Sequence, residues 1–168
     1  PLSAWCRARA ELPDPAQLPR RRSRRPRPHL VVTAGLIRRG QRLLLARRPP
    51  GGMLAGMWEF PGGKREPGES LRACLVREIR EELGIAIDVG RQVACVDHDY
   101  THLSITLHAF AARYRSGRVR AMGCAAWAWV EPGRLDDYAM PRADRKISAH
   151  LGWEGRRTGH FETEEWAE

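Results

Sequence analysis

The sequence predicts an α+β domain in which two helices pack against a mixed β-sheet. One amphipathic helix, with an apolar residue at every fourth position, lies between two groups of short apolar segments, and a second helical segment follows a late proline. The chain of 168 residues is long enough to bury one core without disulfides. Its 42% hydrophobic and 29% charged residues exclude a disordered chain and a membrane protein.

Two strands open the predicted domain. Residues 30–37 are apolar and partly β-branched, residues 42–47 carry three leucines between basic flanks, and Gly40 favours a turn between them. We expect these two strands to pair antiparallel. Residues 49–57 form a loop rich in proline and glycine, and residues 58–60 form a short strand after it.

The long helix is predicted over residues 69–83. Ser70 is suited to cap its N-terminus and Gly84 to end it, because serine accepts hydrogen bonds from free N–H groups and glycine adopts the left-handed conformation. The apolar stripe consists of Leu71, Leu75, Ile79 and Leu83.

The second half of the chain predicts further strands and a closing helix. Residues 92–96, 103–111 and 127–130 have strand character, the second of them with clear alternation of apolar and polar side chains. A last helix is expected over residues 142–151, after Pro141.

The positive charge of the chain is concentrated at its N-terminus. The net charge is +9, and residues 1–29 hold eight arginines against two acidic residues, together with six of the twelve prolines. We therefore predict a basic connector over 1–29, a domain over 30–152 and an acidic tail over 153–168. The arginines of residues 20–27 have two interpretations, a solvated tail or a segment that binds the phosphate backbone of DNA.

The cysteines and the apolar segments predict a cytoplasmic protein. The four cysteines form no CxxC pair, which argues against a zinc site or a secreted disulfide framework. The longest apolar stretch is too short to cross a bilayer, so we expect no membrane partner. The composition leaves the oligomeric state open.

Three glutamates gather on one side of the long helix. Glu78, Glu81 and Glu82 fall within an arc of about 100° at helical spacing. Crowded carboxylates repel one another unless a cation neutralises them, and Mg²⁺ or Mn²⁺ takes oxygen ligands of this kind. The alternative is a solvated helix face on which Arg77 and Arg80 supply ion pairs.

The region around these glutamates resembles the Nudix box, GX5EX7REUXEEXGU. The match begins at Gly63, continues through Glu69 and ends at residues 77–85, with every fixed position of the pattern present. The resemblance implies a Nudix fold, which is an α/β/α sandwich with a mixed sheet. It also implies a metal-dependent hydrolase that cleaves a nucleoside diphosphate linked to another group.

The same resemblance implies roles for individual residues. Gly62 and Gly63 let the backbone approach metal and phosphates, Arg77 orients a glutamate, and Glu69 supports the site from the helix start. The implied metal ligands are Gly63, Glu78, Glu81 and Glu82. The metal then polarises a phosphoryl oxygen and orients the attacking water.

Flanking residues resemble the MutT-type hydrolases of oxidised guanine nucleotides. That resemblance implies that Arg48 and Phe60 face the base, that Lys64 lies beside the substrate and that Asp144 reads the purine edge. The implied reaction converts 8-oxo-dGTP to 8-oxo-dGMP and pyrophosphate, in avoidance of DNA damage. Two alternatives remain: Phe60 belongs only to the core, and Asp144 is only a helix N-cap.

A second resemblance covers the connector and the domain together. Residues 1–6 look like the end of the iron–sulfur motif of MutY-type adenine DNA glycosylases, whose C-terminal domain recognises 8-oxoguanine in DNA without hydrolysing nucleotides. It implies that Tyr100, Thr101 and His102 approach the lesion. The alternative is that His98 and His102 are ordinary surface histidines.

Two departures bear on the choice among Nudix activities. MutT-type enzymes often carry one more glutamate where this chain has Gly123, which leaves the general base open. A hydrolase of an ADP-sugar or dinucleotide is a third alternative. It is disfavoured because no proline occurs between Pro67 and Pro132, where the ADP-ribose hydrolases carry one.

Overall fold

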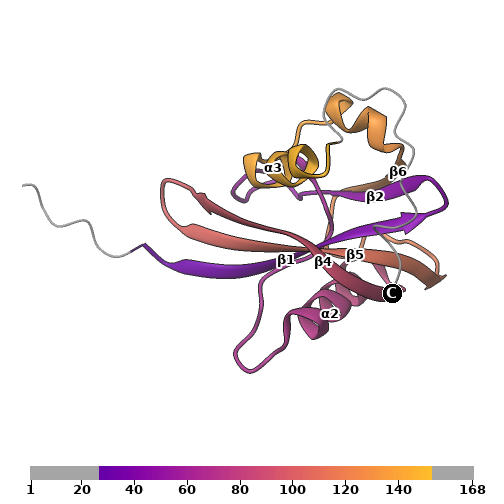
Figure 1. Ribbon diagram of the computed structural model, residues 1–168, viewed down its shortest axis with the longest axis horizontal. Coiled ribbons are helices and arrows are strands. Elements are labelled where there is room, and N and C mark those ends of the chain that lie inside the picture. The colour runs from indigo at the N-terminus through magenta and orange to yellow at the C-terminus, as the bar shows by residue number, and fades with distance from the viewer. Residues whose placement is uncertain (1–26, 153–168) are drawn as a thin grey trace, which may run out of the picture.

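A mixed sheet lies between two helices in the computed structural model, which describes residues 27–152. The helix α2 lies on one face of the sheet and α3 on the other (Figure 1), as the predicted sandwich requires. The elements are β1 (His29–Arg39), β2 (Arg42–Arg47), β3 (Trp58–Glu59), α2 (Leu71–Leu83), β4 (Ile85–Asp99), β5 (Ser104–Gly117), β6 (Ala126–Val130), the 3₁₀ helix η3 (Pro132–Asp137) and α3 (Arg142–His150).

Several sequence predictions fall outside the described residues. They are the iron–sulfur resemblance at Cys6, all but the last residue of the arginine run 20–27, and the acidic tail 153–168. The boundaries of the connector and the tail therefore stay predictions.

The sheet runs in the order β3-β2-β1-β5-β4. A further strand, β6, lies off this path and pairs antiparallel with β2. The strands β1 and β2 pair antiparallel around Gly40, as predicted. The strands β1 and β5 pair in parallel, from His29 beside Ser104 to Arg38 beside Arg113, which makes the sheet mixed. This parallel pair brings distant parts of the chain together at the centre of the sheet.

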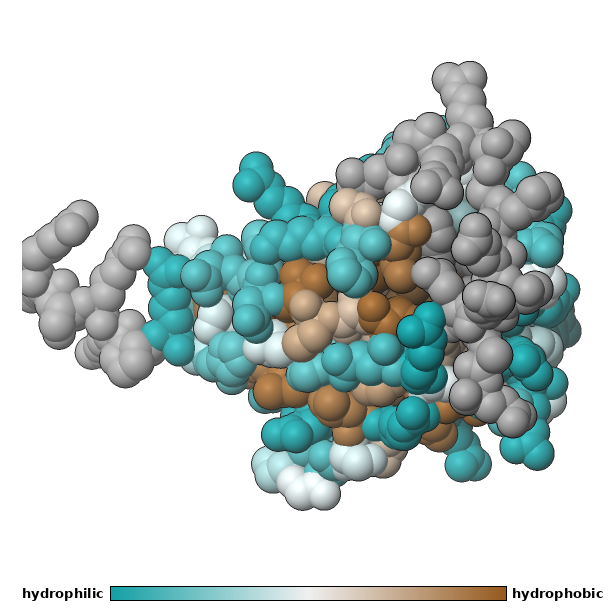
Figure 2. All heavy atoms as spheres, viewed as in Figure 1, coloured by the Kyte–Doolittle hydropathy of each residue, from teal (hydrophilic) through white to brown (hydrophobic). Residues whose placement is uncertain are grey.

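Each face of the sheet carries its own core. Successive strand residues point to opposite faces, so Leu36 packs on the α3 side while its neighbour Ile37 packs on the α2 side. The α3-side core also contains Phe60, and the α2-side core contains Leu75 and Ile79. In the view of Figure 2 hydrophobic residues form a band across the middle of the molecule, with hydrophilic residues above and below it.

The long helix has the predicted caps. The Ser70 Oγ accepts a hydrogen bond from the Ala73 N–H at 3.1 Å, and the helix begins at Leu71 because Ser70 itself is extended. Gly84 ends the helix with φ 68°, and its N–H donates to the Arg80 carbonyl. Within residues 27–152, no helix is long and apolar enough to cross a membrane.

Two strands are longer than the sequence predicts. The strand β4 begins at Ile85, directly after the helix stop, whereas the apolar pattern indicates a start at Gln92. A register shift between Val89 and Gln92 interrupts the alternation of inward and outward side chains along β4, so the sequence pattern does not reveal the first half of this strand. The strand β5 likewise continues to Gly117 because β4 supplies its hydrogen-bond partners.

Candidate active site

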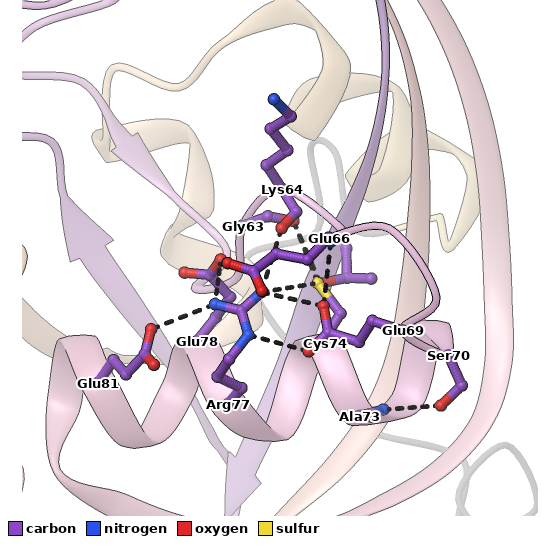
Figure 3. A network of polar contacts seen from close by, with 11 residues as sticks. Gly63, Lys64, Glu66, Glu69, Ser70, Ala73, Cys74, Arg77, Glu78 and Glu81 are labelled. Atoms are coloured by element: carbon purple, nitrogen blue, oxygen red, sulfur yellow. Dashed lines mark hydrogen bonds and ion pairs between the residues drawn. The ribbon is translucent and has the colours of Figure 1, made fainter.

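Two adjacent glycines let the loop after β3 pack between β1 and α2. A Cβ atom on Gly63 would lie 2.5 and 2.6 Å from the two carboxylate oxygens of Glu78. Gly62 has φ 157°, and a Cβ there would overlap the backbone carbonyl of Thr33 on β1. Both positions therefore exclude a side chain, and Figure 3 shows Gly63 next to Glu78.

Arg77 binds three glutamates at once (Figure 3). Its Nε and Nη2 donate to the two carboxylate oxygens of Glu69 at 2.9 and 3.0 Å. Its Nη1 donates to Glu78 at 2.9 Å and to Glu81 at 3.2 Å, and Nη2 also reaches the Lys64 carbonyl at 3.2 Å. The sequence prediction was that Arg77 orients a glutamate, and the structure shows contacts with three of them, Glu69, Glu78 and Glu81.

This network changes the acidity of Glu69. The hydrogen bonds from Arg77 lower the pKa of Glu69 to about 2, since they stabilise the charged carboxylate. The same bonds, first of all those to Glu69, raise the pKa of the Arg77 guanidinium. Glu69 and Arg77 therefore both stay ionised throughout the physiological pH range, and their ion pair ties the residue before the N-cap of α2 to the middle of the helix.

Glu82 has the opposite environment. Burial, and then repulsion from Glu78 and Glu59, raise the pKa of Glu82 to about 7. Glu82 and Glu78 both line a cavity, whereas the side chain of Glu81 is 60% exposed and lies beside Arg77 outside it. Because Glu82 is withdrawn from solvent, the alternative of a fully solvated helix face does not describe it.

These oxygen donors fit a hard divalent cation. Burial and the charge of Glu78 both disfavour an ionised Glu82, and a bound cation would relieve both effects. The residues that would hold it are Glu78 and Glu82 in the cavity, with Glu81 next to them. In the described part of the chain, no three His, Cys, Asp or Glu side chains are close enough to form a metal site as they stand. The carbonyl of Gly63, the remaining predicted ligand, already accepts the Thr33 N–H at 2.9 Å, the Thr33 hydroxyl at 3.4 Å and the Cys74 thiol at 3.7 Å.

The cavity has a volume of about 330 Å³ and two chemically different ends. One end holds Glu78, Glu82 and the glycine loop, and the other lies near the N-terminus of α3. The predicted substrate residues that line it are Arg48, Phe60, Gly62, Gly63, Lys64, Tyr100 and Asp144. Thr101 and His102 do not line the cavity and are exposed in the loop between β4 and β5.

Asp144 connects α3 to the end of β3. It is 6% exposed, and its Oδ1 accepts the backbone N–H of Phe60 at 3.0 Å. The alternative that Asp144 is only an N-cap is wrong, because Pro141 holds that position and no side chain caps the helix. Burial, and then the charge of Glu59, raise the pKa of Asp144 to about 7.

Phe60 belongs both to the core and to the cavity. It is 3% exposed and packs in the α3-side core, so the core alternative describes its burial correctly. It also lines the cavity, where its ring offers an apolar surface to a ligand. The two interpretations of Phe60 are therefore compatible.

The sequence predicts the loop 49–57 but indicates neither that loop nor Glu59 as part of the site. Arg48 donates through Nη1 to Glu59 Oε2 at 2.8 Å and through Nε to the Met53 carbonyl at 3.0 Å. Met53 and Leu54 line the cavity, and Leu54 has a positive φ of 61°. One feature of the sequence could have indicated Glu59. It is an acidic residue between Trp58 and Phe60 in a short strand, and a carboxylate buried among aromatic side chains needs a basic partner.

The family of the chain follows from its match to known proteins. A family model described as NUDIX domain matches residues 33–150. The chain belongs to the Nudix family. It is a hydrolase of that family, whose members act on nucleotide substrates and generally use divalent metal ions.

Similar proteins include enzymes named for different nucleotides. The CTP pyrophosphohydrolase of Escherichia coli (strain K12) is 42% identical over 115 residues, which cover 68% of this chain and 85% of that protein. The 8-oxo-dGTP diphosphatase of Proteus vulgaris is 38% identical over 82 residues, 48% of this chain and 73% of that protein. The crystal structure of a MutT protein from Methanosarcina mazei Go1 superposes with a TM-score of 0.69 at 28% identity and covers 77% of this chain and 97% of that one. These matches support the Nudix fold and the hydrolase hypothesis, and they give no support to the glycosylase alternative.

Tyr100 is the member of the predicted lesion-reading loop that reaches the Nudix cavity. Its backbone N–H donates to the Leu103 carbonyl at 2.8 Å, and its own carbonyl accepts Arg27 Nη1 at 3.2 Å. The ring of His98 packs edge-on against Tyr100 at 4.6 Å. His98 lies on β4 and His102 in the exposed loop, positions that agree with the alternative of surface histidines.

Gly123 offers no carboxylate to the Nudix site. Its N–H donates to the Glu82 carbonyl at 3.1 Å, and a Cβ there would lie 3.0 Å from Glu82 Cγ. The backbone at this position is therefore packed against α2. MutT-type enzymes often carry a glutamate at this position, and in this chain the space for its Cβ is limited by the Glu82 side chain.

Proposed function

We propose that this Nudix hydrolase converts 8-oxo-dGTP to 8-oxo-dGMP and pyrophosphate with Mg²⁺, or with Mn²⁺ in its place. The observation that carries the proposal is one cavity with carboxylates and a glycine loop at one end and Asp144, Phe60 and Arg48 at the other. A nucleoside triphosphate has the same division into phosphates and base. The physiological role would be avoidance of DNA damage.

The phosphate end carries the groups that hydrolysis needs. Gly62 and Gly63 present backbone without side chains, and Lys64 adds a positive charge that favours phosphate oxygens. Glu78, Glu81 and Glu82 would hold the divalent ion, which when bound polarises a phosphoryl oxygen. Arg77 would orient two of these ligands through its hydrogen bonds to Glu78 and Glu81.

The base end can distinguish oxidised from normal guanine. Oxidation at C8 converts N7 of guanine from an acceptor into an N–H donor, and the Asp144 carboxyl is an acceptor that faces the cavity. The Phe60 N–H donates to Asp144 Oδ1 and so holds the carboxyl in the lining of the cavity. The ring of Phe60 supplies an apolar surface for the base.

Cytidine triphosphate is a second candidate substrate. The 42% identical relative is named a CTP pyrophosphohydrolase. The same Asp144 carboxyl can accept a hydrogen bond from the exocyclic amino group of cytosine. The two candidates share the phosphate end of the cavity and differ only in what Asp144 reads.

We also propose that residues 20–27 bind the phosphate backbone of DNA, and that the domain boundaries are those of the sequence prediction. Clustered arginines support the first proposal, because each phosphate that they neutralise releases a counterion. The affinity for duplex DNA should then fall steeply with salt. Unchanged affinity after removal of residues 1–26 would contradict it.

The test of hydrolysis is pyrophosphate release from 8-oxo-dGTP, dGTP and CTP in the presence of Mg²⁺. We expect the Glu82→Gln variant to lose at least about a hundredfold in kcat, since it removes a carboxylate from the metal-binding set. Glu131→Gln is the matched control, because Glu131 is exposed and lies outside the cavity. Equal turnover by the parent chain and Glu82→Gln would overturn the proposal.

A further inference from the structure

A second cavity lies on the sheet apart from the Nudix site. It has a volume of about 410 Å³, and β1, α2, β4 and β5 all contribute to its lining. It shares no lining residue with the cavity that holds Glu78, Glu82 and Asp144. Its volume is within the range of sites that bind small molecules.

Arginines dominate the lining of this cavity. Arg38, Arg72, Arg91 and Arg113 contribute guanidinium groups from four different elements, and Asp88 is the single acidic residue among the described lining residues. Arg38 and Arg113 are direct neighbours across the parallel pair β1 and β5, so their side chains leave the same face of the sheet.

Small residues complete the lining of the cavity. They are Gly90, Ala111 and Ala112, and a Cβ on Gly90 would lie 3.2 Å from the Ala111 carbonyl. The register shift between Val89 and Gln92 places Gly90 and its neighbour outside the regular ladder. A bulge of this kind bends a strand and redirects side chains, here that of Arg91.

One of the arginines is already held in place. Arg72 donates from Nη1 to the Val89 carbonyl, and its guanidinium lies 5.7 Å from the centre of the Phe110 ring. These contacts come from β4 and β5 and fix an α2 side chain at the edge of the cavity. Ordering before binding lowers the entropy cost of recognising an anion.

We propose that this arginine-lined cavity binds a phosphate-bearing anion without a metal ion. Guanidinium groups match pairs of phosphate oxygens through two parallel hydrogen bonds, and four arginines line this cavity. Pyrophosphate and a nucleoside monophosphate both present that chemistry. The proposal does not depend on which nucleotide the Nudix site hydrolyses.

Isothermal titration of the full chain in EDTA, at constant ionic strength, tests this site. Without metal the carboxylates of the Nudix site repel phosphate, and dependence on the cavity arginines separates this site from the arginines of residues 20–27. The probes are inorganic pyrophosphate and GMP. Binding that the cavity variants weaken supports the proposal, with the tighter probe identifying the source, and binding that they leave unchanged contradicts it. We expect Arg91→Gln and Arg113→Gln each to weaken the Kd about tenfold or more.

Two further variants keep the test decisive. Arg113→Lys retains the charge but cannot form two parallel hydrogen bonds to phosphate, so its Kd should fall between those of the parent and Arg113→Gln. Arg120→Gln removes the same charge outside the cavity and should leave the Kd unchanged. Absence of binding by both probes, or equal weakening by Arg120→Gln, would overturn the proposal.

Discussion

The Asp144 carboxylate accepts the backbone N–H of Phe60 at 3.0 Å, although 84 residues separate the two in the sequence. This bond joins the first turn of α3 to the residue that precedes Pro61 and the glycine loop of the Nudix site. Together with the bond from the Trp58 N–H to the Ala139 carbonyl at 2.8 Å, it fixes the start of α3 beside the segment that leads into the glycine loop. Its loss should affect both stability and substrate preference.

Asp144→Ala should destabilise the fold by about 1–3 kcal/mol, because it leaves the buried Phe60 N–H without an acceptor. Asp144→Asn keeps an acceptor oxygen and should cost less. Urea unfolding of both variants at pH 8 measures the difference. Equal destabilisation by alanine and asparagine would show that the hydrogen bond contributes nothing.

The raised pKa of Asp144 predicts a specific pH dependence of stability. Its pKa is about 7 in the folded chain against a reference value of 3.8, so between those values the folded state binds a proton that the unfolded state lacks. The free energy of unfolding should therefore fall as the pH rises from about 4 to 7, by at most about 1.4 kcal/mol per pH unit from this group. Glu59, Arg48 and Tyr100 also face the Asp144 carboxyl, and a substitution of Asp144 alone leaves these groups in place.

The comparison that isolates this effect is unfolding of the parent and Asp144→Asn across the same pH range. The difference in stability between the two should change through the window and level off above about pH 7. A constant difference from pH 4 to pH 8 would show that Asp144 is ionised in the folded chain throughout.

Arg77→Lys should reduce kcat/KM by about a hundredfold while the chain stays folded. Lysine keeps the charge but cannot bind Glu69 through two bonds and Glu78 and Glu81 at the same time, so the metal-binding carboxylates lose their support. Arg80→Lys on the exposed face of the same helix is the control. The steady-state rate of pyrophosphate release measures both, and comparable rates for the two variants would contradict this role.

Gly63→Ala should raise the Mg²⁺ concentration needed for half-maximal activity. The new methyl group would lie within 2.6 Å of both Glu78 carboxylate oxygens, so that side chain or the loop must move. Gly52→Ala is the matched control, since nothing lies within 4 Å of a Cβ there. A metal titration of activity checks the prediction, which fails if the two variants respond alike.

The sequence predicts local features of this fold better than distant pairings. The helix, its Ser70 cap and its Gly84 stop follow from helical periodicity and backbone preference, which neighbouring residues determine. The parallel pairing of β1 with β5 joins residues about 75 positions apart, and no local pattern indicates it. The first half of β4 was missed because its bulge breaks the alternation on which strand prediction depends.

The candidate site divides in the same way. The resemblance to the Nudix box placed Glu69, Arg77 and Glu78 in one site because the motif fixes their spacing along the chain, and in the structure Arg77 contacts both glutamates. Glu59 was missed because its importance comes from burial beside Arg48, which spacing does not reveal. His102 was included by resemblance and lies outside the cavity in an exposed loop.

In the proposed function, one cavity both hydrolyses the triphosphate and reads the oxidised base. The measurement that checks both is kcat/KM for 8-oxo-dGTP, dGTP and CTP with Mg²⁺, on the parent chain and on Asp144→Ala. We expect kcat/KM for 8-oxo-dGTP to exceed that for dGTP by about tenfold or more, and Asp144→Ala to remove most of this preference. A parent chain that prefers dGTP or CTP, or that releases no pyrophosphate from 8-oxo-dGTP, would contradict it.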